Sequence, residues 1–230
     1  MSLKIKPKPL LARPETRVPI ATRRRSPHLE NGDRLTATEF LRRYEAAADL
    51  KKAQLIEGIV HMPSPVRANA HSEPDGLLHG WLFSYALEHP DLKFYPNATL
   101  VLDPDNAPQP DAALCSAPHP GGKVWLNEKG YLCGAPELVC EIAASSVSVD
   151  LHDKFRAYRR NGIAEYLVWL TEEERVCWFE LADQEYVEKE PKAGKLASSI
   201  FPGLVLDVKA LLKMDRAKLI GTLRSAMSGK

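Results

Sequence analysis

Residues 137–170 read "ELVCEIAASSVSVDLHDKFRAYRRNGIAEYLVWL", and this stretch decides the fold. It begins with the run 138–143, which is apolar apart from one carboxylate, Glu141, and it ends with a second, mostly apolar run, "AEYLVWL", at 164–170. Between the two runs, 148–162 has helical spacing, with capping residues at its start and an Asn-Gly pair at its end. We therefore expect a strand, a helix packed back over that strand, and a second strand.

Hydrophobic spacing predicts the remaining elements on either side of this stretch. Helices are expected over about 37–49 and 67–89. Strands are expected as a pair within 53–62 and singly at 93–103, 109–115, 175–181 and 185–190. A short strand should lead into a C-terminal helix within 201–214, and 116–135 is expected to be a surface loop. Because several strands are linked as hairpins, the fold class is α+β (mixed α/β), with one mixed, mostly antiparallel sheet flanked by helices.

The composition is that of a soluble globular protein, with 44% apolar and 27% charged residues in 230. The chain lacks a run of ~18 apolar residues and a signal peptide, so we expect a cytoplasmic protein without membrane contact. Four cysteines without a Cys-x-x-Cys pair are expected to be buried free thiols, which argues against a zinc ribbon or a disulfide scaffold.

Positive charge is concentrated at the N-terminus. Residues 1–25 carry eight Lys or Arg and one acid, so the rest of the chain has a net charge of about 1 − 7 = −6. We expect 1–33 to be an extended basic arm and 34–230 to be a single domain. The arm is interpreted either as a contact to nucleic acid phosphates or as a solvated or subunit-contacting tail.

Three charged residues interrupt apolar patterns. Asp111 opens a short apolar strand, Glu141 lies in the middle of one, and Lys154 borders the inward stripe of the 148–162 helix. Each has a structural alternative: a turn residue for Asp111, a buried ion pair for Glu141, and for Lys154 either a solvent-directed amine or a pair with Asp150. Lys154 can equally reach across the sheet face toward Glu141.

Together, two nearby carboxylates and an inward lysine are typical of phosphodiester hydrolysis assisted by a divalent metal. Carboxylates bind hard cations such as Mg²⁺, which retain waters. The metal activates water and stabilises charge on a phosphoryl oxygen, and the lysine orients the water or holds the phosphate.

Several ordered motifs carry a family resemblance over roughly residues 35–213. "QPDAALC" (109–115) followed by "APELVCEIAASSVSVDLHDKFRAYRRNGIAEYLVW" (135–169) resembles the Uma-two restriction endonuclease family of the PD-(D/E)XK nuclease superfamily. "AQLIEGIVHMPSP" (53–65) and "FPGLVLDVKALL" (201–212) are similar to its opening and closing segments.

This resemblance implies a restriction-endonuclease-like core, a DNA substrate, and in many relatives a homodimer. It implies that Asp111 and Glu141 are ligands of Mg²⁺ or Mn²⁺, with the backbone carbonyl of Ile142 as a third. The superfamily lysine two residues after the Glu is replaced here by Ala143, and the resemblance places it at Lys154 instead.

Three further residues are accessory candidates on the same resemblance. Gln54 stands where the family carries a Glu, and nearby Glu57 is a possible substitute. His71 matches a family His at the start of a helix, and its structural alternative is a cap or a surface residue.

The sequence leaves more than one function open. The leading interpretation is a Mg²⁺-dependent endonuclease that uses Asp111, Glu141 and Lys154. The alternative is an inactive nuclease-fold protein that binds DNA or a protein. A third is a purely structural ion cluster, for which truncating either carboxylate lowers stability markedly.

Overall fold

A six-stranded sheet forms the centre of the protein. The structure is a computed structural model that describes residues 28–62 and 68–229. The strands lie in the order β11-β10-β9-β8-β5-β3, and every neighbouring pair is antiparallel except the parallel pair β8–β9. Their bounds are β3 Leu92–Pro96, β5 Ala112–Ser116, β8 Leu138–Ala143, β9 Glu165–Leu170, β10 Arg175–Ala182 and β11 Glu185–Glu188.

The expected strand, helix and second strand are confirmed. A π-helical turn, η2 (Val149–Lys154), continues into α3 (Phe155–Arg160) and connects β8 to β9. Parallel neighbours need such a crossover. Every residue of β8 and of β9 is buried, because both sheet faces are covered. Gly162, at φ 78°, ends the helix.

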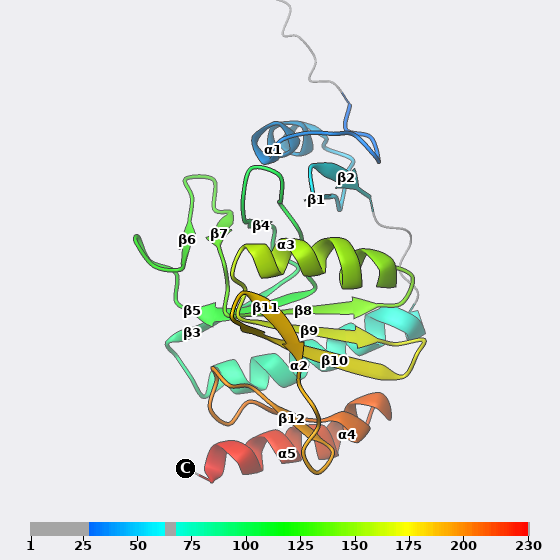
Figure 1. Ribbon diagram of the computed structural model, residues 1–230, viewed down its shortest axis with the longest axis vertical. Helices are drawn as coiled ribbons and strands as arrows, with labels where there is room; N and C mark the ends of the chain where they lie inside the picture. The colour runs from blue at the N-terminus through cyan, green and yellow to red at the C-terminus, as the bar shows by residue number, and fades with distance from the viewer. Residues whose placement is uncertain (1–27, 63–67, 230) are drawn as a thin grey trace, which may run out of the picture.

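Helices cover the two faces of the sheet in layers (Figure 1). α3 lies on one face, and α2 (Glu73–Leu87) lies on the other, preceded by the π-helical turn η1 (Ala68–Ser72). Beyond α2 lie α4 (Val208–Leu212) and α5 (Arg216–Ser228).

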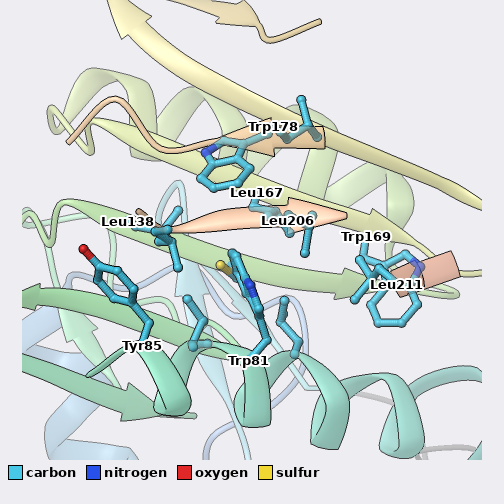
Figure 2. Packing of buried hydrophobic residues seen from close by; sticks show 14 of the residues in the cluster. Trp81, Tyr85, Leu138, Leu167, Trp169, Trp178, Leu206 and Leu211 are labelled. Atoms are coloured by element: carbon cyan, nitrogen blue, oxygen red, sulfur yellow. The ribbon is translucent and has the colours of Figure 1, made fainter. Parts of the chain in front are cut away.

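The core between α2 and the sheet is built from large side chains. Trp81 of α2 meets Trp178 of β10 edge to face, with ring centroids 6.1 Å apart. Leu138 and Leu167 from the sheet and Leu206 from the C-terminal segment fill the same layer (Figure 2). This packing fixes the sheet as a rigid platform.

The N-terminal elements follow the prediction closely. α1 (Ala37–Ala46) begins after Thr36, whose side chain accepts a hydrogen bond from the Glu39 backbone. β1 (Gln54–Ile56) and β2 (Ile59–His61) form the expected antiparallel hairpin.

Two expectations about strands and loops are wrong. The single strand predicted at 93–103 is interrupted at Asn97, which has φ 50°, so that β3 ends and a separate β4 (Leu100–Val101) follows. The loop predicted at 116–135 contains β6 (Val124–Leu126) and β7 (Leu132–Gly134), and β7 pairs with both β4 and β6 in a small three-stranded sheet. Burial of Val124 and Leu132 against the sheet explains these strands.

The C-terminal segment holds more structure than predicted. β13 (Val205–Asp207) runs into α4 as expected, but it pairs with β12 (Lys195–Ala197), and α5 is a second helix. All four cysteines are buried free thiols, as predicted. Within the described residues, no helix is long and apolar enough to cross a membrane.

The predicted fold class is confirmed: helices flank a mixed, mostly antiparallel sheet. Most of the basic arm, residues 1–27, lies outside the described residues, so the division at residue 33 stays a prediction.

Candidate active site

Sheet register brings Asp111 and Glu141 to the same place. Ala112 of β5 pairs with Cys140 of β8, so Asp111, one residue before β5, lies opposite Glu141. Asp111 Oδ2 accepts a hydrogen bond of 2.8 Å from the Ile142 backbone N–H. The two carboxylates are 3% and 2% exposed, so each must find its partners inside the protein.

Alternation along β8 places Glu141 on the face that α3 covers. Cys140 packs in the hydrophobic cluster under α2, whereas Val139 packs in the cluster that includes Tyr158 of α3. Successive side chains of a strand point to opposite faces. Glu141 therefore lies on the same face as Val139. Asp111 lies on the same face as Ala113, two residues further along the chain, and Ala113 packs in the same cluster as Val139.

Lys154, the last residue of η2, reaches Glu141 across this face. Its Nζ lies 2.8 Å from Glu141 Oε1 and 3.0 Å from Asp150 Oδ1. Lys154 is 4% exposed, so it does not extend to solvent. The two pairings that the sequence allowed, with Asp150 and with Glu141, occur together.

Further contacts to Glu141 gather on one oxygen. The Tyr158 hydroxyl donates to Glu141 Oε1 at 2.8 Å, the same atom that pairs with Lys154. Glu141 Oε2 takes part in neither contact. The Asp150 side chain accepts from the Ser146 hydroxyl, and its Oδ1 faces Lys154 without forming a well-aligned hydrogen bond.

The charges of this cluster are unequal. Burial raises the pKa of Glu141 to about 8, and the carboxylates of Asp150 and Asp111 add to the effect, while Lys154 opposes it. Burial would lower the pKa of Lys154, but Asp150, Glu141 and Asp111 outweigh it and raise that pKa. Three buried acids thus share one buried ammonium, which stays charged, and Glu141 is the acid that resists ionisation.

Asp111 is held by a second set of groups. Lys52 Nζ lies 3.6 Å from Asp111 Oδ1, and His71 Nε2 lies 3.6 Å from Oδ2. Burial would raise the pKa of Asp111, but His71, Lys154 and Lys52 outweigh it, so this pKa is about 2. The Asp111 carboxylate in turn raises the pKa of His71.

The backbone of Asp111 is fixed as well. His79 Nε2 lies 2.8 Å from the Asp111 carbonyl oxygen, which can only accept, so this nitrogen carries a proton. The Asn97 N–H donates to the same oxygen at 2.9 Å. The sequence analysis missed His79, although its spacing from Asp75, one helical turn earlier on α2, could have indicated the pair.

Of the three accessory candidates, one contacts the proposed site and two do not. His71 is brought to Asp111. Gln54 accepts from the Gln109 backbone N–H at 3.3 Å, and Glu57 pairs with Arg160 at 2.8 Å. Neither of these contacts involves Asp111 or Glu141. Lys52, in the segment before β1, was also missed, because it lies in no periodic pattern.

The oxygen donors suit a hard cation that binds few protein ligands and keeps most of its waters. In the described part of the chain, no group of three or more His, Cys, Asp or Glu is placed to hold a metal ion. Mg²⁺ commonly binds through one or two carboxylates and keeps its waters. The carboxylates of Asp111 and Glu141, with the open Oε2 of the latter, fit such an ion in chemical type.

The mixed sheet carries two carboxylates and the lysine of the crossover helix on one face. The model of the Uma2 family (the Uma-two family named above), described as "Putative restriction endonuclease", matches residues 37–209. The chain therefore belongs to this family, and the predicted resemblance is confirmed. Family and fold together support a nuclease.

A solved structure shows the same fold. It is the crystal structure of "a putative nuclease belonging to DUF820" from Anabaena variabilis ATCC 29413, at a TM-score of 0.60 and 18% sequence identity. The match covers 78% of this chain and 98% of that one. No curated protein matches the chain.

Proposed function

We propose that this protein is a metal-dependent DNA endonuclease that hydrolyses phosphodiester bonds with Asp111, Glu141 and Lys154. One observation carries the proposal: two carboxylates from adjacent strands share a sheet face with a buried lysine 2.8 Å from one of them. Burying such a charged cluster costs stability, and in a member of a nuclease family a catalytic role explains why the cluster is present.

The carboxylates of Asp111 and Glu141 and the carbonyl of Ile142 would hold Mg²⁺ or Mn²⁺. The N–H of Ile142 points to Asp111, and the N–H and C=O of one strand residue point to the same side. That carbonyl is therefore directed past the end of β5, toward Asp111. When bound, the ion supplies an activated water and stabilises charge on the phosphoryl oxygen.

Lys154 performs the role that a strand lysine would fill at Ala143. Its Nζ is held by Glu141 and Asp150, so the ammonium is oriented before substrate arrives. A charged donor fixed in a dry site stabilises developing negative charge without reorganisation. Lys154 thus orients the attacking water or holds the phosphate.

DNA is the proposed substrate because the family is one of restriction endonucleases. A homodimer is the proposed assembly, and analytical ultracentrifugation of the full chain measures it directly. The basic arm of residues 1–25 is proposed to contact the DNA or the second subunit.

Cleavage of supercoiled DNA in Mg²⁺ or Mn²⁺ tests the function. The wild-type protein, Glu141→Gln and Glu165→Gln are compared, because Glu165 is another fully buried sheet carboxylate paired with a lysine. We expect nicking by wild type and by folded Glu165→Gln, and a loss of at least about a hundredfold in Glu141→Gln.

The same assay and a metal titration can also contradict the proposed activity. If wild type neither cuts supercoiled or single-stranded DNA nor binds Mg²⁺ or Mn²⁺ in calorimetry, the enzymatic proposal is wrong. DNA binding under those conditions then identifies a binding module built on the nuclease fold.

A further inference from the structure

A second lysine lies on the outer side of the carboxylate pair. Lys52 Nζ is 3.6 Å from Asp111 Oδ1, and its side chain is 30% exposed, whereas the side chain of Lys154 is 5% exposed. The two carboxylates therefore lie between a buried ammonium and an accessible one. A ligand that arrives from solvent can reach Lys52.

Lys52 is also oriented by contacts that free surface lysines lack. Its Nζ lies 3.0 Å from Asn97 Oδ1. Asn97 is itself fixed, because its N–H donates to the Asp111 carbonyl and its carbonyl accepts from the Gln109 side chain. Its φ of 50° interrupts β3 at this point. The break in β3 at Asn97 thus places the side-chain oxygen of Asn97 next to the Lys52 ammonium.

Electrostatics indicate what such a lysine binds. The site exposes a phosphodiester to the negative charge of Asp111, whose pKa is about 2, and a like charge nearby opposes its approach. An accessible cation next to the outermost carboxylate offsets that repulsion. Lysine binds phosphate as a point charge, without the planar geometry that arginine requires.

We propose that Lys52 is a phosphate-binding residue, which pairs with Asp111 in the free protein and with a backbone phosphate of the nucleic acid in the complex. This inference rests on the proposed function and adds the subsite that holds the substrate. Asn97 is its positioning residue, because it keeps Nζ at the site while the partner changes from carboxylate to phosphate.

The test measures DNA binding without cleavage, in the Asp111→Asn background and in EDTA. This background removes the carboxylate that competes with phosphate for Lys52, and its amide oxygen can still accept from Ile142. Lys52→Met is compared with Lys51→Met, since Lys51 is the adjacent exposed lysine. Full-length proteins are titrated with one duplex over 50–200 mM salt, so that the N-terminal arm contributes equally.

We expect Lys52→Met to lower affinity about tenfold at 50 mM salt and to make the plot of log K against log salt shallower by about 0.9, the value for one lost phosphate contact. Lys51→Met should change neither, and Lys52→Arg should restore the slope. Asn97→Gly, which tolerates the positive φ, should give a smaller loss with the slope retained.

Two outcomes overturn the inference, and they differ. Equal affinities and slopes for Lys52→Met and Lys51→Met, in proteins that bind DNA, exclude the phosphate subsite and leave the proposed nuclease intact. Absence of DNA binding in wild type and in Asp111→Asn excludes the proposed function and the subsite together.

Discussion

The central sheet contains two buried glutamates that each pair with a lysine, one on each face. On the α3 face, Glu141 pairs with Lys154; on the α2 face, Glu165 of β9 pairs with Lys189 at 3.1 Å. Glu141 is 2% and Glu165 0% exposed. Burial therefore does not distinguish the two glutamates, and their hydrogen bonds must.

The Glu165 carboxylate has both oxygens engaged. Oε1 accepts from Lys189 and from the Ser199 N–H at 2.7 Å, and Oε2 accepts from the Ser198 hydroxyl at 2.6 Å. Lys189 is shared further with Glu180 at 2.9 Å. Every partner comes from the chain, which is what a structural ion pair requires.

The Glu141 carboxylate is arranged differently. Its two contacts converge on Oε1, and its lysine is shared with a second buried acid, Asp150. Both lysines are shared by two acids, so the difference lies in Glu141 Oε2, which these contacts leave free for the proposed cation, whereas both oxygens of Glu165 are engaged. The open acceptor oxygen is therefore the feature that distinguishes Glu141, the proposed metal ligand, from the saturated Glu165.

The largest expected difference between the two pairs is catalytic. Lys154→Met should reduce DNA cleavage about 10²–10⁴-fold, because it removes the group that orients water or holds phosphate. Lys189→Met should leave cleavage per folded molecule unchanged. Both are assayed well below their melting midpoints, and equal losses in the two variants would remove the distinction between the pairs.

The next contrast is in stability, measured by urea unfolding in EDTA at pH 8. Glu165→Gln should lower the free energy of unfolding by about 3–5 kcal/mol, because it leaves Lys189 with a weaker partner in a buried site. Glu141→Gln should leave it unchanged or raise it, since an acid whose pKa is about 8 gains little from ionising there. A large loss in Glu141→Gln favours the structural ion cluster instead.

Sequence reasoning found the three residues of the proposed active site because charges in apolar runs are conspicuous. Asp111, Glu141 and Lys154 each break a periodic pattern, and the crossover helix between two buried strands could be predicted from spacing alone. That Lys154 would pair with both Glu141 and Asp150 was not decided, because a helix border residue can turn either way.

What the sequence missed depends on contacts between distant segments. β7 pairs with β4, about thirty residues earlier, and β6 pairs with β7, so residues 116–135 look like a loop when taken alone. Lys52 lies between two elements and reaches Asp111 because β1 bonds to the segment that leads into β5, through the bridge between Leu55 and Ala107. Neither feature leaves a periodic signal.

The pH dependence of stability sharpens the contrast further. The folded chain keeps the Glu141 proton up to about pH 8, whereas the unfolded chain releases it near 4.5. In this window the folded state binds more protons, so the free energy of unfolding falls as pH rises. Since one pKa unit is worth about 1.4 kcal/mol and nearly the whole window lies between the two pKa values, wild type should lose about 3.5 kcal/mol relative to Glu141→Gln between pH 5 and 8 in EDTA. A constant difference across this range contradicts the raised pKa.

Metal binding gives the smallest expected effect and the most specific one. An ion that binds the folded chain stabilises it by about 1.4 kcal/mol at ten times its dissociation constant, which corresponds to a rise of about 3–5 °C in melting temperature for a chain of this size. Mg²⁺ or Mn²⁺ should produce this rise in wild type and in Glu165→Gln, whose carboxylate is saturated by its own chain. Glu141→Gln and Asp111→Asn should show no rise, because each removes one of the two carboxylates on which the ion depends. A rise of equal size in all four proteins places the ion elsewhere, and it would then follow that the open oxygen of Glu141 is not a metal ligand.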